Sequence, residues 1–333
     1  MKIIFSLSFI LALSVWANAQ QNVCIAFYNQ ENLFDTIDDP HKNDNEFLPT
    51  ARNQWNSEKY FNKLDHMAQV IASLNENKGP DILGMCEVEN LAVVHDMIQQ
   101  KRLKSLKYAA VHFESPDERS IDNALVYKTS KFSLITAYPY PVVIDTLPRF
   151  KTRDILLVKL QAKNKATLIL LVNHFPSRLG GQEASEFKRF RAAAVLKHIF
   201  DSIHAADPNQ AVMAMGDFND EPNDPAMDSI LGAGPDSGFA FFNPMYALHQ
   251  SGMGSHLYRK HWSMLDQFVL NPALYSDKGK FNYSNGSASV FQQAWMLETD
   301  EKYKGAPKRT FAGAKYLNGY SDHFPVYMYL NSR

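Results

Sequence analysis

Several features that would decide the class of a protein at once are scarce in this sequence. Only two of its 333 residues are cysteines, Cys24 and Cys86, so the chain is no disulfide scaffold and must depend on an apolar core. Its 34 Lys and Arg residues nearly balance its 35 Asp and Glu residues, which leaves a formal net charge of −1. A nearly neutral chain has no overall field that draws it onto nucleic acid or an anionic membrane, so any such affinity needs a local patch.

The sequence also lacks the usual marks of a domain boundary: it has no Pro- or Gly-rich linker, no low-complexity tract and no internal repeat.

One long apolar run, residues 3–15, follows Lys2 and precedes an Ala-Asn-Ala tripeptide at residues 17–19, a pattern typical of a cleaved signal peptide. An uncleaved membrane anchor is the alternative, but the run is shorter than the roughly 20 residues of a spanning helix. We therefore expect a signal peptide at residues 1–19 and a single domain at residues 20–333, secreted or periplasmic, with no stable membrane association.

Short apolar runs recur along the chain, with helical patterns between some of them. Apolar residues at spacings of three and four predict one helix over residues 61–74 and another over residues 192–203. Strands that interleave with helices indicate a layered α/β architecture, and the runs are too numerous for one small sheet. The predicted strands cover residues 23–28, 81–86, 124–127, 155–160, 168–172, 211–215, 268–270 and 324–330.

The segment 35–56 is polar and acidic, lacks a period and predicts a long surface loop. Its carboxylates leave open a structural calcium site. Nothing in their spacing decides between a bound ion and a solvated loop.

Polar side chains stand at the ends of six of the predicted strands. Four runs end in them, and two later runs begin with them. If the first four strands run one way and the last two run antiparallel, all six sets meet at one edge of the sheets. They are Asn29, Glu87, Asn173 with His174, and Asp217 with Asn219 after the first four runs, and Asp266 and Asp322 with His323 before the last two.

The stretch MGDFNDEP at residues 215–222 shows the pattern most clearly. Side chains two apart on an extended chain point the same way, so Asp217 and Asn219 should face one spot and Phe218 the core. Asp and Asn at a single strand end commonly make turns, but turns do not explain six coincidences. Crowded carboxylates repel one another, and a hard divalent cation with oxygen ligands would neutralise them. No Cys/His spacing in the sequence points to structural zinc instead.

Together, the segments YNQENLFD, CEVEN, NHFPSR, GDFN, LDQF and SDHFPV resemble the endonuclease/exonuclease/phosphatase superfamily, from about residue 23 to residue 330. That superfamily includes pancreatic-type deoxyribonuclease, abasic-site endonucleases, sphingomyelinases and inositol polyphosphate phosphatases. The resemblance implies a four-layer α/β sandwich, with two mixed β-sheets face to face and helices on the outside. It also implies metal-dependent hydrolysis of a phosphoester at the sheet edge. Magnesium is the metal we expect, because Mg²⁺ commonly binds one or two carboxylates plus substrate phosphate, with Mn²⁺ or Ca²⁺ as substitutes.

The resemblance also implies roles for single residues around the metal. Glu87 resembles the main metal ligand, Asn29 its neighbour, and Asp322 a further carboxylate at or beside the metal. Asp217 and Asn219 resemble the pair that holds the attacking water. Asp217 would take the proton of that water, and fixing the water would remove much of the entropic barrier.

Two histidines and an arginine complete the implied catalytic set. His323 resembles the catalytic histidine, oriented and kept charged by Asp266. His174 resembles the second histidine of the deoxyribonuclease branch, with Asp122 as its partner. Arg153 matches a position that contacts phosphate. Which of the two histidines is the general acid stays open.

Three basic stretches adjoin these residues, at 178–191, 256–262 and 302–320. They are either ordinary solvated loops or a basic rim at the mouth of the site. In the second case their cations contact substrate phosphates, and their aromatic side chains stack on bases. The substrate contacts predicted on these grounds and from the strand ends are Asn173, Arg178, Tyr258, Trp262 and Arg309, besides Asp122 and Arg153.

The sequence therefore predicts a monomeric, secreted, metal-dependent phosphodiesterase. A nuclease that hydrolyses DNA or RNA by in-line attack of an activated water is the leading interpretation. One alternative is a phosphoesterase for small or lipid phosphates, similar to sphingomyelinases or inositol-phosphate phosphatases. Another is a non-catalytic phosphate-binding module on the same fold, which the complete polar set argues against.

The two cysteines are expected to remain unbridged. Asn29 and Glu87 should be neighbours at the metal, and Cys86 adjoins Glu87. Cys24 precedes Asn29 by five residues, which places it roughly 16 Å away along its strand at about 3.3 Å per residue. Disulfide-bonded Cα atoms lie within about 7 Å of each other, so this pair is too far apart.

Overall fold

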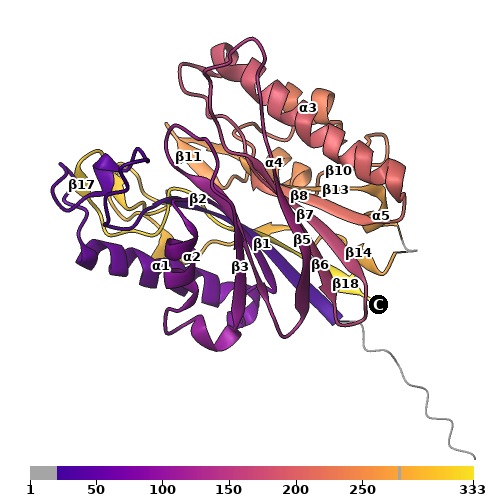
Figure 1. Ribbon diagram of the computed structural model, residues 1–333, viewed down its shortest axis with the longest axis horizontal. Helices are drawn as coiled ribbons and strands as arrows, with labels where there is room; N and C mark the ends of the chain where they lie inside the picture. Colours follow the sequence, from indigo (N-terminus) through magenta and orange to yellow (C-terminus); the bar gives the residue numbers. More distant parts are fainter. Residues whose placement is uncertain (1–20, 277–278) are drawn as a thin grey trace, which may run out of the picture.

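Two large β-sheets pack face to face in the computed structural model, which describes residues 21–276 and 279–333 (Figure 1). Helices α1 (Ser57–Asn77) and α2 (Leu91–Ile98) cover one sheet, and helix α3 (Gln182–Ala206) covers the other. This arrangement is the predicted four-layer α/β sandwich. The predicted signal peptide lies outside the described residues. Within those residues, no helix is long and apolar enough to cross a membrane.

The first sheet joins both ends of the described chain. Its strands lie in the order β14 (Phe281–Tyr283), β18 (Val326–Ser332), β1 (Gln21–Leu33), β2 (Ile82–Val88), β4 (Asp122–Lys128) and β3 (Tyr108–His112), and β15 (Ser289–Val290) also pairs with β18. β1 runs parallel to β2 and antiparallel to β18. Asn29 lies opposite Cys86 in this register, so the carboxyl ends of β1 and β2 meet at one edge.

The second sheet brings three of the polar strand ends into register. Its strands lie in the order β5 (Phe132–Tyr140), β6 (Ile155–Ala162), β7 (Thr167–His174), β8 (Ala211–Asp217), β13 (Asp266–Leu270), β10 (Phe241–Phe242) and β9 (Ala233–Gly234). β7 is parallel to β8, with His174 opposite Asp217. β13 is antiparallel to β8, with Asp266 also opposite Asp217. The directions predicted for the six strands are therefore confirmed.

Smaller elements surround the two sheets. They are the hairpins β11 (His256–Tyr258) with β12 (His261–Ser263) and β16 (Phe311–Ala312) with β17 (Lys315–Tyr316), the short helices α4 (Tyr246–Gln250) and α5 (Pro272–Tyr275), and single helical turns at Asn45–Phe47, Lys104–Leu106, Ala226–Leu231 and Ala294–Met296. An isolated bridge joins His256 to His323, which anchors the β11–β12 hairpin beside the polar edge.

Successive side chains of the central strands point to opposite faces of the second sheet, and both faces are buried. In β8, Met213 and Met215 belong to the core between the sheets, whereas Val212 and Ala214 belong to the core under α3. Strands covered on both faces read as continuous apolar runs, which is why these strands are visible in the sequence. The sheets approach closely at Gly84 of β2, where an added Cβ would lie 2.5 Å from the sulfur of Met215.

The eight predicted strands and both predicted helices are present, with some local differences. Phe61, counted on the apolar face of α1, is 55% exposed, because Tyr60 takes the inward position in that turn and donates to Asp96. Strand β3 and helix α2 have no counterpart among the predictions, and neither has the edge strand β5. Its Leu134 and Ile135 remain exposed, so β5 lacks the burial pattern on which the strand predictions depend.

The predicted surface loop at residues 35–56 is held by its own side chains. Asp44 is buried, and its Oδ2 accepts the backbone N–H of Asp39 at 2.8 Å. Trp55 is also buried and donates its indole N–H to the carbonyl of Phe34 at 3.0 Å. The loop is therefore anchored by internal contacts, and a calcium ion there stays a prediction.

Both cysteines are buried and free, as the register of β1 and β2 predicts. We expect two titratable thiols per chain when the unreduced protein is unfolded and treated with Ellman's reagent. Burial, followed by the charge of Asp81, raises the pKa of Cys24 to about 12, so the folded protein should react far more slowly. Finding no free thiol after unfolding would contradict this register.

Candidate active site

A hydrogen bond between the two sheets lies at the centre of the edge where the polar strand ends meet. Asn29 at the end of β1 donates its Nδ2 to Asp217 Oδ2 at the end of β8, at 3.1 Å. The two residues are 188 positions apart in the sequence, so only the packing of the sheets brings them together. Asn29 Oδ1 accepts the N–H of Glu31 at 2.8 Å. Asn29 therefore contacts the Asp217 carboxylate and the backbone of Glu31, and its place among the metal ligands stays a prediction.

Asp217 is buried between two histidines. The Nε2 atoms of His174 and His323 each lie 3.8 Å from Asp217 Oδ2. Burial raises the pKa of Asp217 to about 6, against the lowering effect of the charge on His323. Asp217 is thus ionised at neutral pH but remains a better proton acceptor than an exposed aspartate, because its pKa is close to the working pH.

The predicted contact between Asp266 and His323 is present. His323 Nδ1 lies 2.7 Å from Asp266 Oδ2, and Asp266 is fully buried. Burial alone would lower the pKa of His323, but the charge and hydrogen bond of Asp266, together with the charge of Asp217, raise it well above the ordinary value. His323 is therefore a cation at neutral pH, held in one orientation.

The protonation state of His174 is opposite to that of His323. Burial, with smaller contributions from Arg153 and Arg119, lowers the pKa of His174 well below the ordinary value, so its ring is neutral. Its Nδ1 has no hydrogen-bond partner. The prediction that Asp122 is the partner of His174 is wrong, because Asp122 lies in the first sheet with its Oδ2 3.2 Å from Nε2 of His112 on the neighbouring strand.

Glu87, the predicted main ligand, lies beside an arginine that sequence reasoning missed. Its Oε2 accepts the N–H of Asn32 at 2.9 Å, and its Oε1 is 3.1 Å from Arg119 Nη2. Arg119 also donates to Asn32 Oδ1 at 2.8 Å. It belongs to the loop between β3 and β4 and to none of the six motifs, so only the tertiary structure reveals it.

A second residue that sequence reasoning missed, the carboxylate Glu31, lies next to Asp322. Arg309 bridges the two, with Nε 3.2 Å from Glu31 Oε1 and Nη2 2.8 Å from Asp322 Oδ2. Burial, then the charge of Asp322, raises the pKa of Glu31 to about 7 despite Arg309 and the buried Lys63. Glu31 follows Asn29 by two residues in YNQEN, and that proximity is the signal that would have found it.

The geometry predicted for the GDFN stretch is wrong at Asn219. β8 ends at Asp217, and Asn219 has a left-handed backbone with φ of 50°. Asp217 Oδ1 accepts the N–H of Asn219 at 2.9 Å, which closes a turn, and Asn219 Nδ2 donates to the carbonyl of Phe175. The two side chains are therefore not presented in parallel as on an extended strand. Phe218 is buried, as predicted.

Two predicted substrate contacts are part of the scaffold instead. Arg153 is buried, with Nη1 2.9 Å from Asp117 Oδ2 and Nη2 donating to the carbonyl of Phe175 at 2.7 Å. Asn173 is fully buried and donates to the carbonyl of Leu171 at 2.8 Å. Because these donors are used inside the protein, neither side chain is placed to hold a phosphate.

Of the other predicted substrate contacts, Arg178 and Trp262 are also part of the scaffold, whereas Tyr258 is exposed. Arg178 is 2.8 Å from Asp224 and braces the turn after β8. The ring of Trp262 stacks on Phe324 at 5.8 Å, which ties the β11–β12 hairpin to the core. Tyr258, on the same hairpin, is 60% exposed and remains available to a substrate.

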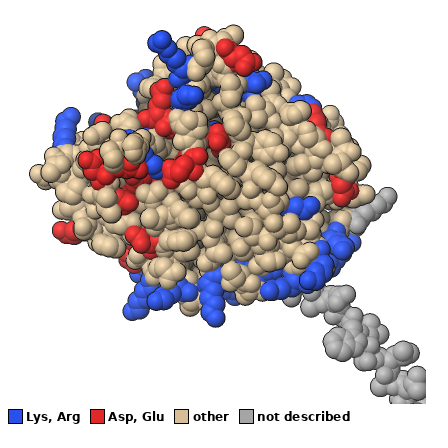
Figure 2. All heavy atoms as spheres, in the orientation of Figure 1, with Lys and Arg blue, Asp and Glu red and all other residues tan. Residues whose placement is uncertain are grey.

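A continuous basic rim is missing from the face in Figure 2. There, Lys and Arg gather along the lower margin, whereas Asp and Glu predominate around β2 and β17. Several cations of the basic stretches are also paired, Lys304 with Glu301 and Arg309 with Glu31 and Asp322. Charge near the site is therefore largely compensated within the protein.

A family model described as Endonuclease/Exonuclease/phosphatase family matches residues 24–332. The chain belongs to this family. Its members hydrolyse phosphoesters and generally depend on divalent metals, and this chain is a phosphoester hydrolase. No curated protein matches the chain by sequence.

Solved structures share the fold at low sequence identity. A family protein from Bacteroides thetaiotaomicron is 15% identical with a TM-score of 0.58, covering 94% of this chain and 99% of that one. A mannosyl-6-phosphatase from B. thetaiotaomicron VPI-5482 is 14% identical with a TM-score of 0.56, covering 92% and 99%. D. rerio TDP2, complexed with a single-strand DNA product, is 14% identical with a TM-score of 0.56, covering 93% and 99%.

The residues at the edge fit the divalent metal that the endonuclease/exonuclease/phosphatase family uses. Glu87, Asp322 and Glu31 supply carboxylate oxygens, the ligands that hard divalent cations prefer. Arginine cations already contact all three, Arg119 at Glu87 and Arg309 at the others. Burial, followed by the charge of Asp322, nevertheless raises the pKa of Glu31 to about 7, so the arginines do not fully offset the cost of ionising this carboxylate. A metal ion beside these oxygens would supply the missing positive charge.

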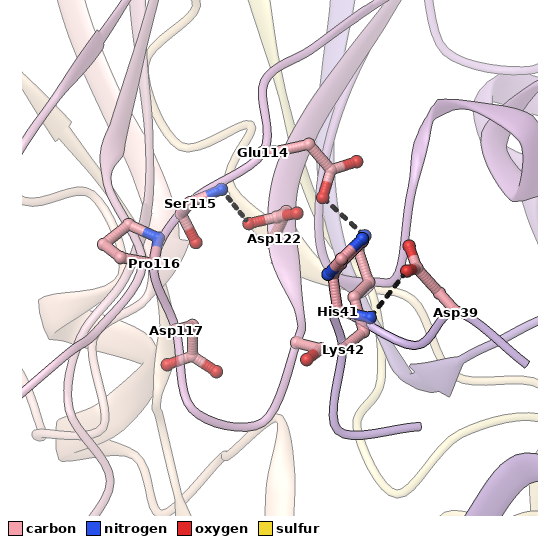
Figure 3. Close-up of a pocket in the computed structure, with 9 residues that line it drawn as sticks. Asp39, His41, Lys42, Glu114, Ser115, Pro116, Asp117 and Asp122 are labelled. Atoms are coloured by element: carbon pink, nitrogen blue, oxygen red, sulfur yellow. Dashed lines mark hydrogen bonds and ion pairs between the residues drawn. The ribbon is translucent and has the colours of Figure 1, made fainter. Parts of the chain in front are cut away.

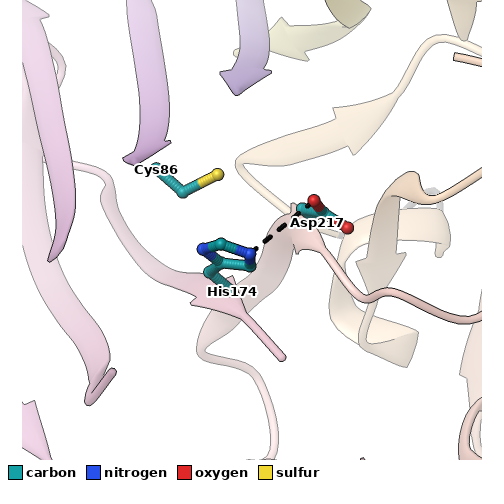
Figure 4. A group of neighbouring side chains, drawn as sticks. All are labelled: Cys86, His174 and Asp217. Atoms are coloured by element: carbon teal, nitrogen blue, oxygen red, sulfur yellow. Dashed lines mark ion pairs between the residues drawn. The ribbon is translucent and has the colours of Figure 1, made fainter. Parts of the chain in front are cut away.

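Cys86 lies near the same edge, next to two of the catalytic candidates. Figure 4 shows Cys86 beside His174 and Asp217, and their ligand atoms all lie within 4.8 Å of one another. Burial, followed by the charges of Asp217 and Glu87, raises the pKa of Cys86 well above the ordinary value. Without a metal ion the sulfur therefore stays protonated, and an ion bound there would have to displace the thiol proton.

We predict that Asp266→Asn moves the alkaline limb of the kcat/KM profile to lower pH. Asp266 is the strongest influence that raises the pKa of His323, so His323 should lose its proton at lower pH in the variant. At neutral pH, kcat should fall about 100-fold or more. His323→Ala should show a similar loss, and the double variant should be little worse than either, because the pair acts as one unit. An unmoved alkaline limb in Asp266→Asn would contradict the assignment.

Proposed function

We propose that this chain hydrolyses phosphodiester bonds of nucleic acid by in-line attack of a water molecule, with Mg²⁺ as its metal. The observation that carries the proposal is the position of Asp217, a buried carboxylate between a neutral and a cationic histidine. A proton acceptor, a positive charge and a cluster of carboxylate oxygens thus lie at one edge.

Each of these groups has a distinct task in the proposed reaction. Asp217 accepts the proton of the attacking water, since it is ionised above pH 6 or so. His323, charged and fixed by Asp266, stabilises the negative charge of the transition state and donates a proton to the leaving oxygen. Neutral His174 offers a hydrogen bond from Nε2. A divalent ion held by Glu87, Asp322 and Glu31 would neutralise a phosphate oxygen.

Support for a nucleic-acid substrate comes from the hairpin beside the site. The exposed ring of Tyr258 lies on the hairpin whose His256 bridges to His323, where it could stack on a base. TDP2 of D. rerio, which shares the fold, is known with a single-strand DNA product.

A second candidate is the hydrolysis of small or lipid phosphate esters. It is favoured by the pairing of Arg119, Arg178 and Arg309 with carboxylates, which leaves few free cations for a polymer. The mannosyl-6-phosphatase with the same fold is consistent with this alternative. In either case we propose a monomeric protein that is exported to the periplasm or secreted, on the signal-peptide pattern of residues 1–19.

Metal titrations should separate the roles of Glu87 and Asp217. We expect Glu87→Gln to weaken metal binding, so that excess Mg²⁺ or Mn²⁺ restores part of the rate. Asp217→Asn should remove the proton acceptor and lower kcat about 100-fold or more, with little rescue by metal. The measurement is release of p-nitrophenol from bis(p-nitrophenyl) phosphate across a metal series. Full metal rescue of Asp217→Asn would make that residue a plain ligand and remove the proposed base.

The substrate class is tested with single-stranded DNA, RNA, sphingomyelin and inositol phosphates assayed side by side. We expect the highest kcat/KM on nucleic acid. Tyr258→Ala should raise KM on single-stranded DNA about tenfold, since stacking of one base is worth roughly 1–3 kcal/mol, and leave bis(p-nitrophenyl) phosphate unaffected. Tyr138→Ala, at an exposed tyrosine of the edge strand β5, is the matched control. A preference for small or lipid phosphates would establish the second candidate instead.

A further inference from the structure

A pocket of about 240 Å³ lies between the acidic loop and the turn that connects β3 to β4. Figure 3 shows Asp122 between Ser115 on one side and Glu114 with Lys42 on the other. His41 also lines the pocket. These residues do not belong to the edge at Asp217.

Asp122, which lines this pocket, forms an unusual buried pair with His112. Nε2 of His112 lies 3.2 Å from Asp122 Oδ2, and each side chain is only 3% exposed. Nevertheless, His112 Nε2 makes no hydrogen bond in the structure. Asp122 Oδ1 accepts the N–H of Ser115 at 2.8 Å, which leaves Oδ2 directed at the imidazole. A buried ring nitrogen without a hydrogen bond is rare and calls for another partner.

A metal ion would explain the separation of these atoms. Two ligands at about 2.1 Å from one metal, at angles between about 90° and 110°, are roughly 3.0–3.4 Å apart. The distance between His112 Nε2 and Asp122 Oδ2 falls in this interval.

Glu114 supplies a third donor. Its carboxylate and the ligand atoms of His112 and Asp122 all lie within 4.8 Å of one another. The ammonium of Lys42 contacts the Glu114 carboxylate and donates to the carbonyl of Glu89, so a cation is already drawn to this cluster. Because Glu114 is more than half exposed, its side chain has room to turn toward an ion.

We propose that His112, Glu114 and Asp122 bind a divalent transition-metal ion, Zn²⁺ by preference, at a site separate from the catalytic edge. One imidazole nitrogen with two carboxylates suits zinc, whereas Mg²⁺ and Ca²⁺ take oxygen ligands. His41 lines the same pocket. The proposal stands whichever phosphoester is the substrate.

The site would tie down the loop that reaches the catalytic edge. His112 ends β3 and Asp122 begins β4, so an ion between them joins both ends of that loop. The same loop carries Arg119 to Glu87. The proposed ion therefore stabilises the position of Arg119 without touching the reacting atoms.

The experiment uses full-length protein carrying Glu87→Gln, which we expect to weaken metal binding at the catalytic edge. After chelation, the protein is dialysed against micromolar Zn²⁺, and bound zinc per chain is measured by mass spectrometry. Adding His112→Gln or Glu114→Gln should remove one equivalent of zinc, or weaken its affinity about tenfold or more. His198→Gln, at an exposed histidine of α3, is the matched control and should keep that equivalent.

Circular dichroism checks that each variant is folded, and Glu114→Gln decides alone if His112→Gln fails to fold, because the Glu114 side chain is 55% exposed. Cobalt substitution gives a second measurement, since a His-carboxylate site yields visible absorption that both substitutions should abolish. Unchanged zinc content in Glu114→Gln and in folded His112→Gln would overturn the proposal. A loss of equal size in His198→Gln would overturn it as well.

Discussion

The buried carboxylate of Asp217 is the constraint on which the site depends. Two sheets converge on it, because Asn29 of the first sheet donates to it and Asp266 of the second lies opposite it in register. A buried negative charge is costly unless it is compensated, and here the compensation comes from His323, whose own charge depends on Asp266. The three groups are therefore linked, and removing one leaves the others with an unfavourable buried charge.

Backbone strain accompanies this arrangement. Glu31, Asn32, Glu87 and Asn219 all have left-handed backbones, with φ between 47° and 58°. Left-handed conformations cost free energy in residues other than glycine and persist where surrounding contacts impose them. At this edge the contacts are visible: Glu87 accepts the N–H of Asn32, and Asp217 accepts the N–H of Asn219. Three of these residues coincide with the register shifts of β1 and β2, between Asn29 and Leu33 and between Cys86 and Val88.

Much of the fold was predictable because burial leaves a periodic pattern. Central strands such as β7 and β8 are apolar on both faces, and their polar ends are abrupt. Residues of the site were predictable where they lie at either end of such a strand or just before it, as with Asp217, Asp266 and His323. Prediction failed where a side chain turns inward to a contact outside its motif. Arg153 donates to Asp117, and Asn219 lies in a turn closed by Asp217. Arg119 lies in a loop, away from any strand end.

The sequence by itself determined the order of strands and helices, the family and the chemical types at the catalytic edge, because these depend on local periodicity and short motifs. Tertiary structure alone decided which charges meet. Glu31 meets Arg309, Asp122 meets His112 rather than His174, and one histidine is charged while the other is neutral. The physical reason is that protonation and pairing depend on burial and on charges brought close by packing, and both involve residues far apart in the chain.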